Sequence, residues 1–133
     1  MKNPANPNLR RTLRRLALLA SISLLAACGG GGVENILNSL WIYSVDAPSH
    51  ANNDADVTVT ARASSTGNIS DDDMDWSWHQ NSGKEVSNLS IEKVGNSSVL
   101  RFKAPSENTT VSFTVKVEAK GLSDSENLSI TVD

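Results

Sequence analysis

The stretch V-S-F-T-V-K-V-E-A, residues 111–119, decides the fold of this chain. Every second residue in it is apolar: Val111, Phe113, Val115, Val117 and Ala119. The residues between them are polar or charged. Because successive side chains of a β-strand point to opposite faces, this period of two predicts a strand with one buried and one exposed face.

The same alternation recurs elsewhere in the chain. It is clear at residues 57–63 (VTVTARA) and 128–132 (LSITV), and weaker at 39–45, 74–80, 87–94 and 98–104. Turn-forming residues separate these segments, and we interpret 121–126 (GLSDSE) as the turn before the last strand. A single sheet would leave its apolar face exposed. The sequence therefore predicts an all-β fold, a seven-stranded antiparallel sandwich over residues 39–133.

Several short motifs follow one another in a characteristic order. An acidic turn precedes a strand with two tryptophans, and Q-x-S-G at 80–83, F-x-A-P at 102–105 and F-T-V at 113–115 come next. Residues 71–132 thereby resemble the bacterial relatives of the polycystin-type (PKD) repeat, whereas 39–70 fit loosely. The resemblance implies an immunoglobulin-like sandwich that acts as a spacer or as an adhesive, carbohydrate-associated module.

The three tryptophans are the residues most suited to a binding or core role. We interpret Trp78 as the core tryptophan of the third strand, packed between the sheets. Trp76 has the same parity and should lie on the same face, nearer the start of the strand. Trp41 lies near the middle of the first strand, and if exposed it could stack on a sugar or contact a membrane interface. Trp41 and Trp76 are therefore the candidate binding residues.

An acidic run is the strongest charge feature, with carboxylates at Asp71, Asp72, Asp73 and Asp75. These four groups could ligate calcium, which takes six to eight oxygen ligands. The run lacks the spacing of an EF-hand, so we favour a solvated acidic turn that guards a strand end.

The other chemistry-bearing residues are sparse. Two histidines, His50 and His79, are too few for a zinc site, which needs three or four ligands. The chain has many Ser and Asp residues but no local signature of a catalytic nucleophile. We therefore expect neither enzymatic activity nor a resident metal or cofactor.

The N-terminus has the order of an export signal. Residues 1–15 are basic and polar, and 16–27 (LALLASISLLAA) are apolar or small. Twelve such residues are too few to span a bilayer as a helix, which needs about 20. The sequence Leu25-Ala26-Ala27-Cys28 resembles the lipobox of bacterial lipoproteins, and Cys28 is the only cysteine of the chain.

The lipobox implies removal of a signal helix, residues 1–27, by cleavage between Ala27 and Cys28. It further implies a diacylglyceryl group on the Cys28 thiol and an acyl chain on the new amino group, which together hold a protein firmly at a membrane. Residues 28–38 are then the lipidated cysteine and a glycine-rich tether, whose ten residues after Cys28 reach about 16–19 Å. Gly29 in place of Asp implies, by the rule of enteric-type bacteria, the outer rather than the inner membrane.

The charge of the part after residue 27 excludes one class of partner. It has seven basic and fifteen acidic side chains, hence a net charge of −8. Nucleic-acid binding needs a basic surface, so we expect no nucleic-acid partner. Our main hypothesis is a lipid-anchored module of the cell envelope for adhesion, binding or spacing, with a protein or glycan partner. The alternative is a periplasmic inhibitor or assembly factor that docks a loop or an edge strand on one envelope enzyme or machine.

Overall fold

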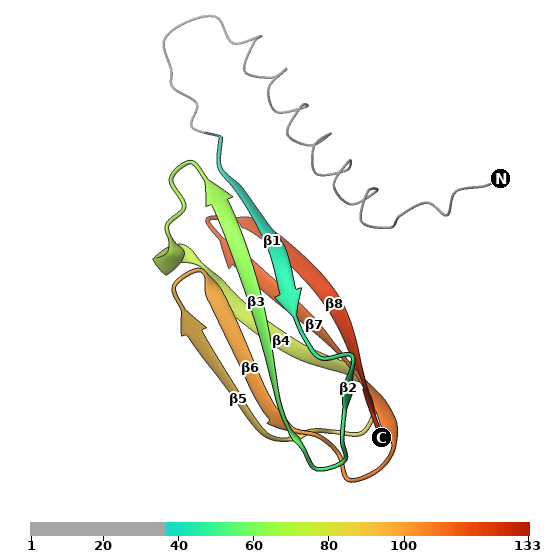
Figure 1. Cartoon of the computed structure of the whole chain (residues 1–133). Coiled ribbons are helices and arrows are strands. Elements are labelled where there is room, and N and C mark those ends of the chain that lie inside the picture. The colour runs from blue at the N-terminus through green and yellow to red at the C-terminus, as the bar shows by residue number, and fades with distance from the viewer. Residues whose placement is uncertain (1–36) are drawn as a thin grey trace, which may run out of the picture. The chain divides into compact units, whose positions relative to one another are not determined.

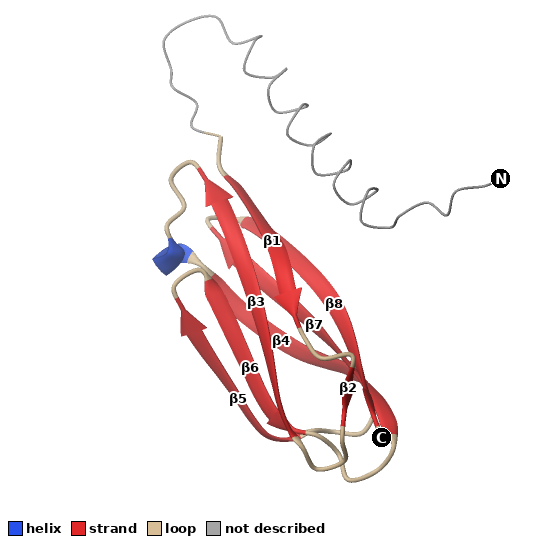
Figure 2. Cartoon of the chain, viewed as in Figure 1, coloured by secondary structure: helices blue, strands red, loops and turns tan. Residues whose placement is uncertain are grey.

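The computed structural model describes residues 37–133, so the expected signal helix, Ala27, Cys28 and most of the tether lie outside the described residues. Asn38–Asp133 form one compact unit. Its elements are shown in Figures 1 and 2: β1 (Ser39–Asp46), β2 (His50–Ala51), β3 (Asp56–Thr66), the 3-10 turn η1 (Asp71–Asp73), β4 (Asp75–Ser82), β5 (Ser87–Val94), β6 (Ser97–Lys103), β7 (Thr109–Ala119) and β8 (Leu122–Val132).

The strands form two four-stranded sheets that pack face to face as a sandwich. One has the order β1-β3-β6-β5 and the other β2-β8-β7-β4. All seven predicted strands are present, which confirms the predicted fold class. The structure adds β2, a two-residue strand that pairs parallel with the end of β8, whereas all other neighbours are antiparallel.

The core lies between the sheets and is built from the alternating residues that predicted the strands. One cluster surrounds Phe102 of β6 and Phe113 of β7, whose ring centroids are 5.2 Å apart. A second cluster surrounds Met74 and the inward residues at the beginning of β1 and the end of β7. Val45 and Trp78 pack against both clusters, so they join the two halves of the core.

Trp78 occupies the predicted core position. Its ring packs between the sheets, half-buried because β4 is an edge strand. The indole Nε1 donates a hydrogen bond of 2.9 Å to Oγ of Ser98 on β6, in the opposite sheet. The fully buried Ser98 hydroxyl thus has a partner, and the tryptophan links the sheets where other sandwiches use a disulfide.

The turn predicted at 121–126 is wrong in extent. The chain reverses at Lys120 and Gly121, both with positive φ, and β8 begins at Leu122. Asp124 is therefore a strand residue on the inward face, and its carboxylate accepts a hydrogen bond of 2.7 Å from the Ile42 N–H of β1. Of the polar residues that indicated a turn, Asp124 and Glu126 lie at inward, half-buried positions of β8, and Ser123 and Ser125 are exposed.

The edges of both sheets are interrupted. The registers of β1, β4 and β5 each shift at a bulge, next to Tyr43, Asn81 and Asn88 respectively. On β5, the exposed Lys93 lies opposite the buried Ser98, hence on the inward side of this edge strand, and its Nζ donates to the Asp72 carbonyl. Bulges and inward charges are features that hinder uncontrolled pairing of edge strands.

Candidate functional site

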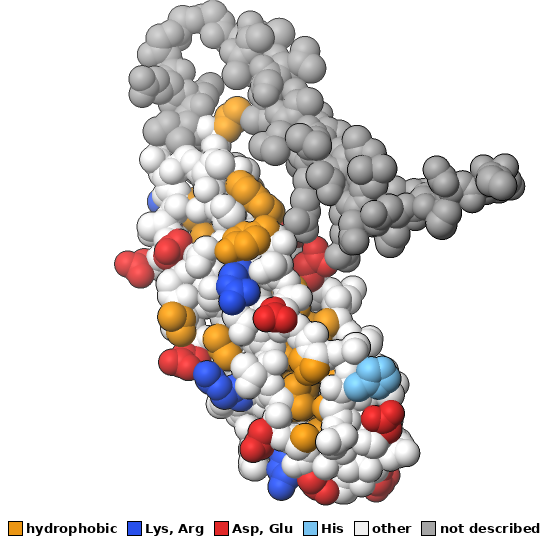
Figure 3. All heavy atoms as spheres, in the orientation of Figure 1, with side chains coloured by type: hydrophobic (Ala, Val, Ile, Leu, Met, Phe, Trp, Pro, Cys, Tyr) orange, Lys and Arg blue, Asp and Glu red, His pale blue; other side chains and the backbone are white. Residues whose placement is uncertain are grey.

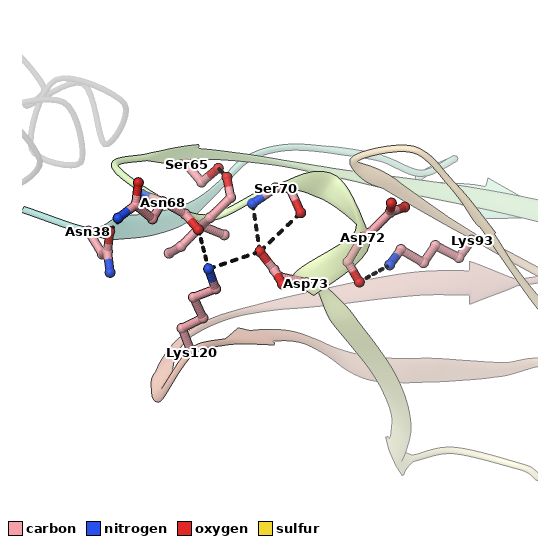
Figure 4. A network of polar contacts seen from close by, with 9 residues as sticks. Asn38, Ser65, Asn68, Ser70, Asp72, Asp73, Lys93 and Lys120 are labelled. Carbon is pink, nitrogen blue, oxygen red and sulfur yellow. Dashed lines mark hydrogen bonds and ion pairs between the residues drawn. The ribbon is translucent and has the colours of Figure 1, made fainter. Parts of the chain in front are cut away.

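The acidic turn is held by a capping box at η1. The backbone N–H and the hydroxyl of Ser70 donate to Asp73 Oδ2 at 2.8 and 3.0 Å (Figure 4). Lys120 Nζ lies 3.4 Å from the same oxygen. The hydrogen bonds from Ser70, first the backbone bond and then the hydroxyl, lower the pKa of Asp73 from its usual value, and the charge of Lys120 adds to this effect.

The four carboxylates of the acidic run have different roles in this geometry. Asp73 is turned back onto Ser70, Asp71 and Asp72 are exposed in η1, and Asp75 is exposed at the start of β4. Within residues 37–133, no group of three or more His, Cys, Asp or Glu side chains is placed to hold a metal ion. Calcium binding by this run therefore gains no geometric support from the described residues.

The same network fixes the end of the domain where the tether joins. Asn38 Oδ1 accepts a hydrogen bond of 2.8 Å from the Asn68 N–H, and Lys120 Nζ donates to the Asn68 carbonyl (Figure 4). We call Asn38, Asn68, Ser70, Asp73 and Lys120 the tether-end network. It links the first residue before β1, the loop after β3 and the turn between β7 and β8.

Trp41 lies on the outer face of its sheet, near the tether end. Its neighbours Leu40 and Ile42 are buried, so its side chain points away from the core and is half-buried. Tyr43 is 48% exposed. We call Trp41 and Tyr43 the tether-end patch; Figure 3 shows hydrophobic side chains gathered over β1 at this end.

Trp76 is placed differently from Trp41. It lies on the inward face of β4, as its parity predicted, and packs against the second core cluster. Its Nε1 is buried and has no hydrogen-bond partner among the described residues. Of the two candidate binding residues, Trp41 is thus the one whose side chain points outward.

The Q-x-S-G motif has a structural role. The Gln80 amide nitrogen donates to the carbonyls of Ser82 and Lys84, and its oxygen accepts from the Val86 N–H. At Gly83, with φ of +89°, an added Cβ would lie 2.3 Å from the Thr110 carbonyl oxygen. The motif therefore shapes the turn between β4 and β5.

The histidines lie on separate strands. His50 is on β2, with Nδ1 3.8 Å from Asp133 Oδ2, and His79 is exposed on β4, as its parity predicted. In the part of the chain that the structure describes, no helix is long and apolar enough to cross a membrane.

Sequence reasoning missed three residues that matter here. Tyr43 follows Trp41 at a spacing of two, which would have predicted that both side chains lie on the same face of the strand. A bulge next to Tyr43 shifts the register at this point. Asp124 alternates with Leu122 and Leu128, which would have extended β8 had the polar residues not indicated a turn. Lys93 lies at an inward position of β5 that alternation alone would assign to an apolar residue.

The sandwich is similar to the crystal structure of a conjugative transposon lipoprotein from Bacteroides eggerthii DSM 20697, with a TM-score of 0.52 and 15% sequence identity. The similarity covers 68% of this chain and 95% of that chain. At this identity it shows a shared fold. No family model matches the chain, and no curated protein matches its sequence. The resemblance to polycystin-type repeats thus rests on the sequence motifs alone.

Proposed function

We propose that this chain is a lipid-anchored protein of the bacterial cell envelope, with Cys28 as the lipidated residue and residues 39–133 as a non-catalytic module. The module serves adhesion, binding or spacing toward a protein or glycan partner. The observation that carries the proposal is the single cysteine, in a lipobox directly before a tether and a β-sandwich. The fold shared with a solved lipoprotein supports it.

The use that the fold makes of its polar side chains supports a non-catalytic role. Gln80 shapes a turn, Asp73 caps η1 and Asp124 joins two strands. These three polar side chains are thereby engaged in structure. The outward surface available for recognition includes the polar faces of the strands, the tether-end patch and the exposed apolar residues of β5.

The anchor is tested by metabolic labelling with a palmitate analogue. We expect the wild-type chain to take up label and to fractionate with membranes, and Cys28→Ala to take up none. A matched control is Ser23→Ala, which leaves the lipobox intact. Label retained by Cys28→Ala would contradict the assignment of Cys28.

The membrane of residence follows from Gly29 under the same proposal. In an enteric-type host, we expect the wild-type protein in the outer membrane and Gly29→Asp in the inner membrane after density-gradient separation. If the wild type and Gly29→Asp have the same distribution between the two membranes, the outer-membrane assignment is wrong, whereas the anchor proposal still stands.

The alternative, a periplasmic inhibitor or assembly factor, is favoured by one observation. Among residues 37–133, three of the five exposed large apolar residues, Leu89, Ile91 and Val94, lie on the edge strand β5. Such a strand could pair with an extended segment of a partner. Photocrosslinking from position 91 in living cells distinguishes the two: an adduct with a single envelope enzyme or machine favours the alternative, and the absence of any adduct at this edge favours the main proposal.

A further inference from the structure

The tether-end patch lies where the chain leaves the tether. Trp41 is three residues beyond Asn38, which at about 3.3 Å per residue is about 10 Å along the strand. Hydrogen bonding of Asn38 to Asn68 and of Lys120 to Asn68 holds this end in place. The patch therefore has a fixed position relative to the last residue of the tether.

The length of the chain outside the domain sets the typical distance of this end from the anchor. Ten residues separate Cys28 from Ser39, and a flexible glycine-rich segment of that length has a root-mean-square reach of about 16–19 Å. A short flexible linker gives two tethered surfaces an effective concentration in the millimolar range. A surface with weak affinity for lipid is thus sufficient for docking at this distance.

The chemistry of the patch matches the membrane–water interface. Tryptophan and tyrosine concentrate there because their apolar rings lie among the upper acyl chains while the N–H or O–H stays hydrated. Tyr43 is 48% exposed, and Trp41 points away from the core. These two aromatic side chains distinguish this end from β5, whose exposed apolar residues are aliphatic.

The charge of the protein selects the kind of lipid. The part after residue 27 has a net charge of −8, which repels an anionic surface. At this end the network leaves Asp71 and Asp72 exposed, whereas Lys120 is paired with Asp73. A zwitterionic headgroup such as phosphatidylethanolamine is therefore the matching surface.

We propose that the tether-end patch docks on the zwitterionic lipid surface to which Cys28 anchors the chain, with Trp41 and Tyr43 at the level of the headgroups. This inference rests on the proposed anchor. Docking fixes the orientation of the sandwich: the outer face of β1 at the tether end faces the membrane, and the opposite sheet, β2-β8-β7-β4, faces away from it.

The test uses the full lipidated protein in vesicles of phosphatidylcholine and phosphatidylethanolamine, with and without brominated phospholipid. Bromine quenches tryptophan fluorescence only at close range, so the difference between wild type and Trp41→Phe reports Trp41 alone. We expect brominated lipid to quench the fluorescence of Trp41. The quenching should be no stronger when phosphatidylglycerol is added. The matched control is Ile91→Ser, which removes a side chain of 47% exposure on β5 and should leave quenching unchanged.

The outcomes separate the two proposals. If the wild type does not float with vesicles, the anchor proposal fails. If it floats and brominated lipid quenches wild type and Trp41→Phe equally, the docking proposal fails alone. Quenching seen only with anionic lipid overturns the assignment to a zwitterionic surface. If Trp41 is protected from acrylamide quenching only at high protein-to-lipid ratios, the patch contacts a second copy of the chain instead of lipid.

Tyr43→Ser provides a second variant, which keeps Trp41 as the reporter. We expect it to weaken quenching of Trp41 by brominated lipid while the protein remains bound to the vesicles. Unchanged quenching in Tyr43→Ser would restrict the contact to Trp41 and overturn the role given to Tyr43.

Discussion

Gln80 makes three hydrogen bonds, all to backbone groups at the end of β4 and in the segment between β4 and β5. Replacement by alanine leaves the Val86 N–H and two carbonyls without these partners. We expect Gln80→Ala to lower the free energy of unfolding by about 1–2 kcal/mol in urea denaturation. Glu85→Ala, an exposed change in the same segment, should stay within about 0.5 kcal/mol of wild type. Equal midpoints for both variants would show that the amide bonds contribute nothing.

Trp78 combines packing between the sheets with a hydrogen bond to a buried hydroxyl. We expect Trp78→Ala to lower the free energy of unfolding by about 3 kcal/mol, near the lower limit for large core aromatics because the ring is half-buried. Trp78→Phe keeps most of the packing and loses the bond to Ser98, so we expect about 1 kcal/mol. Denaturant titration should rank the variants in this order; a reversed order would exclude the packing role.

Asp73 gives the domain a defined response to acid. Its pKa is lowered in the folded state, chiefly by the hydrogen bonds from Ser70, so its contribution to stability is present above the unfolded value of 3.8. That contribution is lost as the pH falls through the lowered pKa. Acidification below pH 3.8 should therefore lower the melting temperature of Asp73→Asn less than that of the wild type. Asp75→Asn, which lies outside the capping box, should respond to acid more like the wild type. Parallel acid curves for wild type and Asp73→Asn would refute this role.

At the scale of the strands, Asp124 connects β8 to β1 across the side of the sandwich. Its carboxylate accepts the Ile42 N–H, a donor at the bulge of β1. We expect Asp124→Ala to lower the free energy of unfolding by about 1–3 kcal/mol, because a partly buried donor loses a charged acceptor. Asp124→Asn keeps an acceptor oxygen and should lose less.

The matched control for Asp124 is Ser125→Ala, on the exposed face of the same strand, with an expected change within about 0.5 kcal/mol. Chemical denaturation monitored by tryptophan fluorescence measures all three variants. If Asp124→Ala and Ser125→Ala unfold at the same denaturant concentration, the link between β1 and β8 has no energetic role.

The strands differ in how well the sequence predicts them, for physical reasons. β7 pairs on both sides and faces the core with every second residue, so its alternation is complete. The first half of β8 lies at the side of the sandwich, where inward positions hold Asp124 and Glu126, and the period of two no longer separates apolar from polar. β2 is two residues long and too short to leave a pattern.

The residues of the candidate site also differ in how well the sequence predicts them. An outward Trp41 was foreseeable because it alternates with two aliphatic neighbours. The bulge at Tyr43 was not, because it depends on the register between β1 and β3. The capping of η1 by Asp73 depends on the path of the loop before it, which the acidic run alone does not specify.

At the scale of the whole molecule, calcium tests whether the acidic run is a site. Binding to the folded state at 100 times the dissociation constant would add about 2.7 kcal/mol. If the turn is only solvated, added ions merely screen the repulsion among its carboxylates. Calcium, magnesium and sodium chloride at matched ionic strength would then shift the melting temperature alike. We expect small and unselective shifts of the melting temperature for residues 33–133. A calcium-selective rise that Asp73→Asn abolishes would establish a calcium site instead.

The two ends of the domain lie at opposite ends of its strands (Figure 1). Asn38 is bonded at the tether end, whereas Asp133 is bonded to Ala51 and Asn53 at the other. A mechanical pull between Asn38 and Asp133 would therefore load β1 against β3 and β8 against β7 along their length. In that geometry many ladder bonds resist at once rather than opening one at a time. Because forced rupture is governed by the unfolding rate, loading many bonds together would slow rupture under such a pull.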